Sequence, residues 1–453
     1  MKEKLLRVAL PILCLGLVQC TGSTTDTSSA PTAFATLRLS ATNGTGDSTF
    51  GAGKTIVTTD IDPTLIDFAM AVAIQADNKI VVGGSNGLAG AGQVALVRYN
   101  ADGSLDTGFG TAGIVKTLLA LPAFASAIAI QADQKIVVAA LAFEAVTSSS
   151  GNTSIVLLRY NTNGTLDNTF GTGGVAASAA IGSGFPGDGC ALLVQGSGNI
   201  VVVGSSQDGN LVLYRYTTLG VLDATFGPTP NGKTVTGLAP SASFPLDRSP
   251  AMAAQSDGRF IVVTRNGDDQ AVLRYSASGV LDTTFGPGAT GIVITDIGGS
   301  LNYANAVAIQ SAGMGVPGNL DKIVVVGHSG VSDATSDISL VRYTKDGVLD
   351  TTFGSGGIVT TNIGGGQFDN AFSVVLQNQT GAEPLILVSG NTGLNGASQT
   401  VVLRYNPDGS PDTSFGSRAI GQVFVPLVGP SSIASGNAIA IQPGLGIVVT
   451  GYD

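Results

Sequence analysis

The sequence predicts an all-β protein, a seven-bladed β-propeller of four-stranded repeats about 60 residues long. Three observations predict this fold. A turn motif recurs seven times, a pair of short apolar strands recurs out of phase with it, and the two ends of the sequence carry complementary parts of one repeat. Abundant glycine (64 residues) and few charged residues (11%) agree with short strands and tight turns rather than helices.

The turn motif is typified by RYNADGSLDTGFG, from Arg98 to Gly110. Every copy contains an arginine, an aspartate and a phenylalanine, which marks an array of equivalent structural units. In sequence order these residues are Arg38, Asp47 and Phe50; Arg98, Asp106 and Phe109; Arg159, Asp167 and Phe170; Arg215, Asp223 and Phe226; Arg274, Asp282 and Phe285; Arg342, Asp350 and Phe353; and Arg404, Asp412 and Phe415.

The motif also looks like part of a calcium loop, but its oxygen donors are not kept from copy to copy. The place of Asp102 is taken by Leu219 in another copy, and leucine cannot coordinate calcium. We therefore predict a structural role: the chain turns at the glycine, the aspartate caps loop amides or pairs with an arginine, and the phenylalanine wedges between blades. A bidentate Arg–Asp contact in each blade would fix their registry. Calcium in one or two loops is the alternative, and no cofactor is expected.

The second recurring element is a hairpin, such as AVAIQADNKIVVGG from Ala71. A third, such as GIVKT from Gly113, follows each Phe-Gly. We group one unit as the GIVxT strand, the AxAIQ strand, the KIVVxG strand and the strand that ends in Arg-Tyr. The KIVVxG strands are continuously apolar, which predicts burial on both faces, as in sheets packed around a ring.

The ends of the sequence predict how the ring closes. We expect the N-terminal strand, at about residues 35–40, to pair with C-terminal strands within about 422–451 and to complete the last blade of a propeller spanning 33–453. Closure removes exposed strand edges. A transmembrane barrel needs longer strands and aromatic girdles, and an open β-solenoid has shorter coils.

These repeats resemble the delta-60 repeat of bacterial secreted proteins and lipoproteins, over essentially Ala35 to Asp453. The resemblance implies a propeller-like fold and a surface location, and it carries no assigned activity.

The N-terminus predicts export. Residues 1–19 look like a lipoprotein-type signal peptide, with basic MKEKLLR and an apolar run, Val8 to Val18, too short to span a bilayer as a helix. LVQC resembles the signal in which the cysteine, here Cys20, is lipidated, although Gln19 departs from the usual small residue. An ordinary or uncleaved secretory signal is the alternative. Residues 20–32 form a Ser/Thr-rich linker.

We therefore expect a lipoprotein of the bacterial cell envelope or outer membrane, periplasmic or surface-exposed, that meets the membrane only through this anchor. A formal net charge of −10 argues against nucleic acid as a partner. Cys190, in an apolar segment, is expected to be buried and inert.

Catalysis has few candidate residues, and we assign no catalytic, cofactor or metal site. His328, the single histidine, is expected in an exposed loop after a KIVVVG strand, with Asp333 and Asp337 nearby. These three are weak site candidates.

Variation between the repeats is more informative about function. Loops after the KIVVxG and GIVxT strands differ widely, whereas the QADNK and LDTTFG loops are uniform. Antiparallel strands would place the variable set on one face. This layout predicts a monomeric, non-enzymatic binding or scaffold module for a protein or glycan ligand. A propeller hydrolase or lyase acting in the central channel is the alternative.

Overall fold

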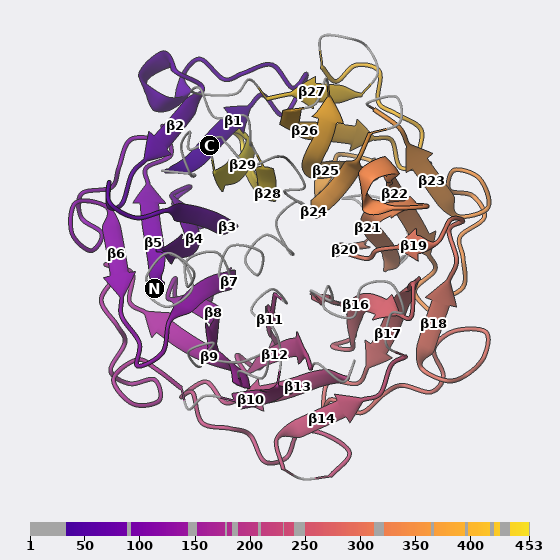
Figure 1. The fold of residues 1–453 in the computed structure, drawn as a ribbon, viewed down its shortest axis with the longest axis horizontal. Coiled ribbons are helices and arrows are strands. Elements are labelled where there is room, and N and C mark those ends of the chain that lie inside the picture. Colours follow the sequence, from indigo (N-terminus) through magenta and orange to yellow (C-terminus); the bar gives the residue numbers. More distant parts are fainter. Residues whose placement is uncertain are drawn as a thin grey trace, which may run out of the picture.

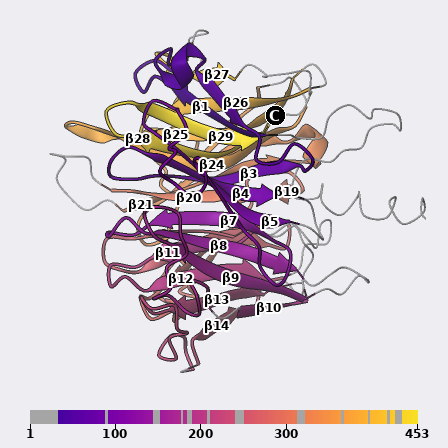
Figure 2. The same ribbon diagram turned by 90° about the vertical axis from the view of Figure 1, so that its left-hand side faces the viewer.

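The computed structural model describes residues 33–87, 92–143, 152–176, 179–183, 189–206, 210–229, 231–239, 250–311, 321–363, 367–394, 397–416, 421–425 and 435–452. The expected signal peptide, Cys20 and the linker lie outside these residues. Seven antiparallel sheets stand in a ring like the blades of a propeller (Figure 1). The side view shows the ring as a thick disc in which the strands run between the two faces (Figure 2). The predicted fold class is confirmed.

Each blade has an inner strand nearest the ring axis, two middle strands and an outer strand (Figure 1). We number the blades from the one that contains the first strand. Blade 1 is β28 (Ser435–Gln442), β29 (Gly446–Tyr452), β1 (Phe34–Leu39) and β2 (Ile56–Thr59); blade 2 is β3 (Asp67–Ile74), β4 (Ile80–Asn86), β5 (Gln93–Tyr99) and β6 (Ile114–Thr117); blade 3 is β7 (Ala123–Ile130), β8 (Ile136–Phe143), β9 (Asn152–Tyr160) and β10 (Ala179–Ser183).

The other four blades repeat this order. Blade 4 is β11 (Ala191–Val194), β12 (Ile200–Ser205), β13 (Leu211–Tyr216) and β14 (Lys233–Thr236); blade 5 is β15 (Ala251–Ala254), β16 (Phe260–Asn266), β17 (Asp269–Tyr275) and β18 (Ile292–Thr295); blade 6 is β19 (Leu301–Asn302), β20 (Ala306–Gln310), β21 (Lys322–Gly330), β22 (Asp337–Tyr343) and β23 (Ile358–Thr361); blade 7 is β24 (Asp369–Gln379), β25 (Ala382–Leu394), β26 (Ala397–Tyr405) and β27 (Gln422–Phe424). Two short 3₁₀ turns, η1 (Phe50–Gly53) and η2 (Asp333–Thr335), complete the described elements.

The ring closes through the first strand, as predicted. β1 pairs antiparallel with β29, with Arg38 opposite Val448, and β2 pairs with β1. The grouping of strands differs from our expectation, however. The GIVxT strand is the outer strand of the blade whose Arg-Tyr strand precedes it, because the tight Asp-Phe-Gly turn folds it straight back, with Val97 opposite Ile114. Blade 1 therefore takes two strands from each end of the chain, and Gln422–Phe424 belongs to blade 7.

The hydrophobic core lies between the blades and not at the ring axis. Seven clusters of buried side chains occur in the described residues, each spanning two adjacent blades. The KIVVxG strands contribute to both neighbouring clusters, as Val201 and Val202 of β12 do. This double burial is why these strands are continuously apolar.

The alternation of strands separates two kinds of loop. Loops that join inner to middle strands and middle to outer strands emerge on one side of the disc, which we call the turn face. Loops between the two middle strands, and those that cross to the next blade, emerge on the opposite side. We call that side the variable-loop face.

Candidate functional site

The recurring turn motif forms the same ion pair in all seven blades. Nε of each arginine donates to Oδ2 of the aspartate, at 2.7 to 2.9 Å. The pairs are Arg38–Asp47, Arg98–Asp106, Arg159–Asp167, Arg215–Asp223, Arg274–Asp282, Arg342–Asp350 and Arg404–Asp412.

The contact is not the bidentate fork that the sequence suggested. In blade 5, Oδ1 of Asp282 accepts hydrogen bonds from the backbone N–H of Thr284 (3.1 Å) and from its hydroxyl (2.6 Å). The second terminal nitrogen of Arg274 turns to that hydroxyl instead. The aspartate thus caps its own turn with one oxygen and binds the arginine with the other.

These contacts keep the aspartate ionised. Burial raises the pKa of Asp282, but the hydrogen bonds from Thr284 and from Arg259, and the charge of Arg274, outweigh it and lower the pKa to about 2. The carboxylate is therefore charged throughout the neutral range.

The phenylalanine of each motif lies beneath the arginine and against the next blade. The guanidinium carbon lies 4.4 to 4.9 Å from the ring centroid in all seven copies. The far side of the ring meets a glycine in the turn of the next blade. In blade 5 this glycine is Gly279, where a Cβ would lie 2.2 Å from Cζ of Phe226.

Arginine and backbone bonds then join each blade to the next. Nη1 of Arg159 donates a hydrogen bond to the carbonyl oxygen of Thr218 (2.6 Å). The backbone N–H of Gly171 donates to the carbonyl oxygen of Leu219 (2.8 Å). Arg404 of blade 7 donates to Ala41 of blade 1 (2.6 Å), so the series closes on itself. The other five arginines donate to Ala101, Thr162, Ala277, Lys345 and Pro407.

We call this set the junction latch: the arginine, aspartate and phenylalanine of one blade with the turn glycine and carbonyl of the next. It explains why these residue types persist in every repeat. In every blade the arginine and the aspartate are both engaged in structural hydrogen bonds.

Sequence reasoning missed two further links between blades. Gln75, at the end of an inner strand, accepts a hydrogen bond from Nη1 of Arg98 (3.2 Å) and donates to the carbonyl of Gln134 in the next blade (3.3 Å). The threonine that ends several outer strands bonds the tyrosine hydroxyl of the next blade, as Thr117 does with Tyr160 (2.7 Å). Both could have been found from the sequence, since this glutamine recurs in every hairpin and this tyrosine in six motifs.

His328 does not lie in an exposed loop, so that expectation was wrong. β21 continues through Gly330, and His328 is only 6% exposed because its ring stacks on Tyr303 (centroids 4.0 Å apart). Arg265 of blade 5 covers the same tyrosine at 4.1 Å.

The structure does not bring the three weak candidates together. Asp337 lies opposite Ser329 in the ladder, and neighbouring residues of a strand point to opposite faces, so His328 and Asp337 face opposite ways. Oδ1 of Asp337 accepts from Asn362 at 2.6 Å. Asp333 lies in η2, and its side chain is outside the described part.

The buried histidine predicts an acid-sensitive step in stability. Burial and the nearby Arg265 lower the pKa of His328 to about 3. The unfolded chain binds a proton near pH 6.5 and the folded chain does not, so stability is complete above that pH and falls by about 1.4 kcal/mol per unit as the pH drops toward 3.

We expect urea denaturation to show this loss between pH 6.5 and 5.5, where no other side chain type normally titrates. His328→Phe should remove the dependence, since it is the only histidine. An equal slope in both proteins would contradict the assignment.

The inner strands offer little acid–base chemistry. Among their described residues only Asp67 and Asp369 are ionisable carboxylates, and both are fully buried at strand starts. Asp67 accepts from Asn86 (2.7 Å) and from the N–H of Ile61 (2.8 Å), and Asp369 accepts from the N–H of Ile363 (2.6 Å). These carboxylates hold loop backbone in place.

Two other features bear on chemistry. Cys190 is buried, which raises the pKa of its thiol to about 12 and leaves it uncharged at neutral pH. Within the described ranges, no three His, Cys, Asp or Glu side chains gather as metal ligands, and no helix is long and apolar enough to cross a membrane.

Comparison with known proteins supports the repeat. A family model described as "Domain of unknown function (DUF5122) beta-propeller" matches residues 75–109, 131–170, 321–353 and 386–415. Each match ends at the phenylalanine of a junction latch and contains its arginine and aspartate. No curated protein matches the sequence.

Solved structures with a similar arrangement are distant. Sqt1 from Chaetomium thermophilum is 13% identical, with a TM-score of 0.46 over 85% of this chain and 94% of that one. A protein from Lactobacillus plantarum is 12% identical (TM-score 0.43; 83% and 93% covered). An exo-1,5-alpha-L-arabinanase from a bovine ruminal metagenomic library is 12% identical (TM-score 0.31; 64% and 99% covered).

The chain is therefore a seven-bladed β-propeller of repeated four-stranded units, and four of its repeats contain segments that match this family model.

Proposed function

We propose that this protein is a surface-anchored, non-enzymatic binding or scaffold module that recognises a protein or glycan ligand through its variable-loop face. The segregation of loops is the observation that carries the proposal. The junction latches occupy the turn face, where the repeats are uniform, and the loops of the opposite face differ from blade to blade. A rigid ring with one diversified face suits recognition.

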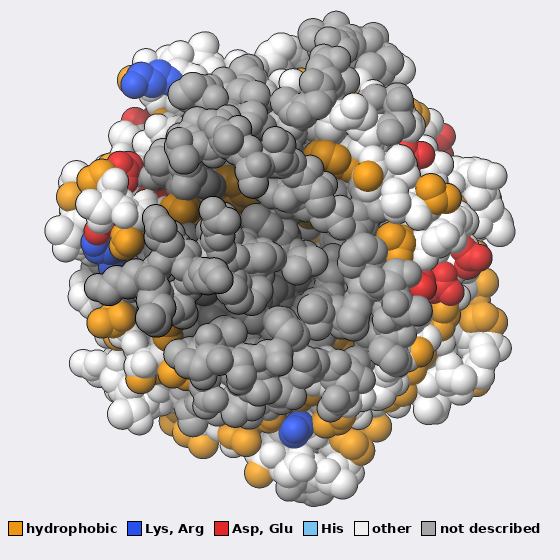
Figure 3. Space-filling model, in the orientation of Figure 1, with side chains coloured by type: hydrophobic (Ala, Val, Ile, Leu, Met, Phe, Trp, Pro, Cys, Tyr) orange, Lys and Arg blue, Asp and Glu red, His pale blue; other side chains and the backbone are white. Residues whose placement is uncertain are grey.

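The described loops of the variable-loop face add apolar side chains that the fold does not use. Leu118 is 73% exposed and Val331 is 72% exposed, more than any other large apolar side chain described. A partner that covered these side chains would gain free energy from removing them from water. Figure 3 also shows acidic side chains at the rim in the sector of β18 to β23, which disfavours an acidic partner there.

A hydrolase or lyase in the channel has less support. Such an enzyme would need ionisable side chains near the ring axis that are free to act on a substrate. The two described inner-strand carboxylates, Asp67 and Asp369, are instead committed to structural hydrogen bonds.

The proposed tether would lie on the recognition side. β1 starts at Phe34 opposite Tyr452, at the variable-loop face. A linker of residues 20–32 reaches at most about 45 Å when extended, so a lipid on Cys20 would hold that face near the membrane. Cys20→Ser should move the protein from the membrane fraction to the soluble fraction of cells that express it. Unchanged membrane association would refute the anchor.

The binding role is tested with matched surface variants. Immobilised protein should capture a ligand from envelope or host-surface extracts, and Leu118→Ser with Val331→Ser should weaken capture by about tenfold or more, since each apolar contact is worth about 1–2 kcal/mol. Leu219→Ser with Val348→Ser is the control, because these side chains are exposed on the turn face. Equal loss in both variants, or none in either, would count against the proposal.

A further inference from the structure

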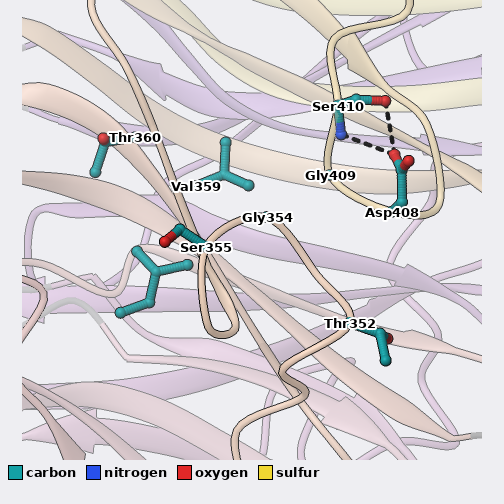
Figure 4. Close-up of a pocket in the computed structure, with 9 residues that line it drawn as sticks. Thr352, Gly354, Ser355, Val359, Thr360, Asp408, Gly409 and Ser410 are labelled. Carbon is teal, nitrogen blue, oxygen red and sulfur yellow. Dashed lines mark hydrogen bonds between the residues drawn. The ribbon is translucent and has the colours of Figure 1, made fainter.

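Two open grooves lie at equivalent blade junctions near the turn face. One, of about 510 Å³, lies between blades 6 and 7, and the other, of about 460 Å³, lies between blades 1 and 2. Figure 4 shows the first, with the Asp408–Gly409–Ser410 turn facing the β23 residues Val359 and Thr360.

The two grooves are built from the same repeat positions. Asp102, Gly103 and Ser104 take the places of Asp408, Gly409 and Ser410. The other lining positions with the same residue in both grooves are Thr49 and Thr352, Gly51 and Gly354, Ile56 and Ile358, Val57 and Val359, and Thr58 and Thr360; Ala52 and Ser355 share a position but differ in residue.

The Asp-Gly-Ser sequence is special to these two junctions and is not needed for the fold. The Asn-Gly-Thr turns at Asn43 and Asn163 make the same two hydrogen bonds, but with an amide in place of the carboxylate. Only these two copies read Asp-Gly-Ser. The other five turns are Asn43-Gly44-Thr45, Asn163-Gly164-Thr165, Leu219-Gly220-Val221, Ser278-Gly279-Val280 and Asp346-Gly347-Val348. The ring therefore accepts either a hydroxyl or an apolar side chain at the serine position.

The groove chemistry is that of hydrogen-bond acceptors beside an apolar wall. Oδ1 of Asp408 accepts from the N–H (2.9 Å) and the hydroxyl (2.6 Å) of Ser410, and these bonds hold the pKa of Asp408 below its usual value. Asp102 and Ser104 repeat the arrangement at 2.9 and 2.7 Å. Half-buried isoleucine and valine side chains form the wall.

Charge then restricts the ligand. Lys54 lines the groove between blades 1 and 2, whereas no basic residue lines the groove between blades 6 and 7. An anion would be repelled by Asp408 in one groove, and a cation would be repelled by Lys54 in the other. A neutral molecule rich in hydroxyl donors suits both, and the volumes fall within the range of about 300–1,000 Å³ typical of small-ligand sites.

We propose that the two Asp-Gly-Ser grooves are equivalent binding sites for a neutral sugar unit. Its hydroxyls donate to the aspartate carboxylate and meet the serine and threonine hydroxyls, while its C–H face rests on the isoleucine and valine wall. These sites lie on the turn side of the ring, so the inference does not rest on the variable-loop face.

Saturation-transfer NMR with D-galactose, D-mannose, L-fucose and N-acetyl-D-glucosamine tests the proposal. We expect transfer to at least one sugar, with a dissociation constant of about 1 mM because the grooves are open. Ser104→Val with Ser410→Val should reduce the transfer at least about fivefold, since it removes both hydroxyls and narrows both grooves. Valine already occupies this position in three other turns, so the variant should keep its melting temperature.

Thr165→Val is the matched control, because Thr165 occupies the same turn position outside both grooves. It should leave the transfer unchanged. If the double variant showed the same saturation transfer as the wild type, the sugar would bind elsewhere and the proposal would be overturned. Absence of transfer from all four sugars, or preferential binding of L-lysine or inorganic phosphate, would also overturn it.

Discussion

Asp282→Ala is expected to lower the free energy of unfolding by about 3 kcal/mol, because it takes the nearest carboxylate from a buried guanidinium and leaves it only Asp346, whose side chain is half-exposed. The side chain of Arg274 is 1% exposed and that of Asp282 is 14% exposed, so water would replace the lost carboxylate only in part. The substitution also removes both hydrogen bonds that cap the turn at Thr284. Urea denaturation followed by circular dichroism measures the loss.

The control is a neighbouring ion pair on the surface. Asp257 binds Arg259 at 2.6 Å, but both side chains are substantially exposed, so Asp257→Ala should cost about 0–1 kcal/mol. The metal content of Asp282→Ala, measured by mass spectrometry, should equal that of the wild type. Loss of bound calcium at unchanged stability would show that the turn is a metal site and not a latch.

Acid should remove the difference between Asp282→Ala and the wild type. The folded-state pKa of Asp282, about 2, lies below the unfolded value, so its contribution is present above about pH 4 and is lost as the pH falls through 2.

Gly279→Ala is expected to destabilise the junction between blades 4 and 5 by about 3 kcal/mol or more, for two reasons that act together. Gly279 has φ of +80°, which favours glycine, and a Cβ there would lie 2.2 to 2.6 Å from three atoms of the Phe226 ring. That ring is fully buried beneath Arg215 and cannot move aside.

Gly258→Ala separates the two reasons. Gly258 has a similar φ of +86°, but nothing lies within 4 Å of its ideal Cβ. The free energy of unfolding of this variant should fall by only about 1 kcal/mol, which is the cost of placing alanine in a left-handed backbone conformation. Equal unfolding midpoints for the two variants would show that contact between glycine and phenylalanine contributes nothing to the junction.

The turn motif was visible in the sequence, but its contacts with the next blade were not. The arginine, aspartate and phenylalanine of the motif were recognisable because each copy needs the same turn, and repetition exposes such a need. The partners of these residues in the next blade were not recognisable. The carbonyl of Thr218 that receives Arg159 carries no sequence signature, since any residue supplies a carbonyl.

His328 shows the opposite error. The segment after the KIVVVG strand was expected to be a loop, but pairing with β22 extends β21, and Tyr303, between β19 and β20 of blade 6, covers the histidine ring. Burial of this kind depends on contacts between strands that the local sequence does not contain.

By itself, the sequence determined the repeat, the number of blades and the closure of the ring, because periodic apolar strands and repeated turns are local properties. Only the tertiary structure decided which strand is outermost in each blade, which side chains lie buried at the junctions, and where open grooves remain between blades. Those outcomes depend on how neighbouring blades pack, and packing joins residues that lie far apart along the chain.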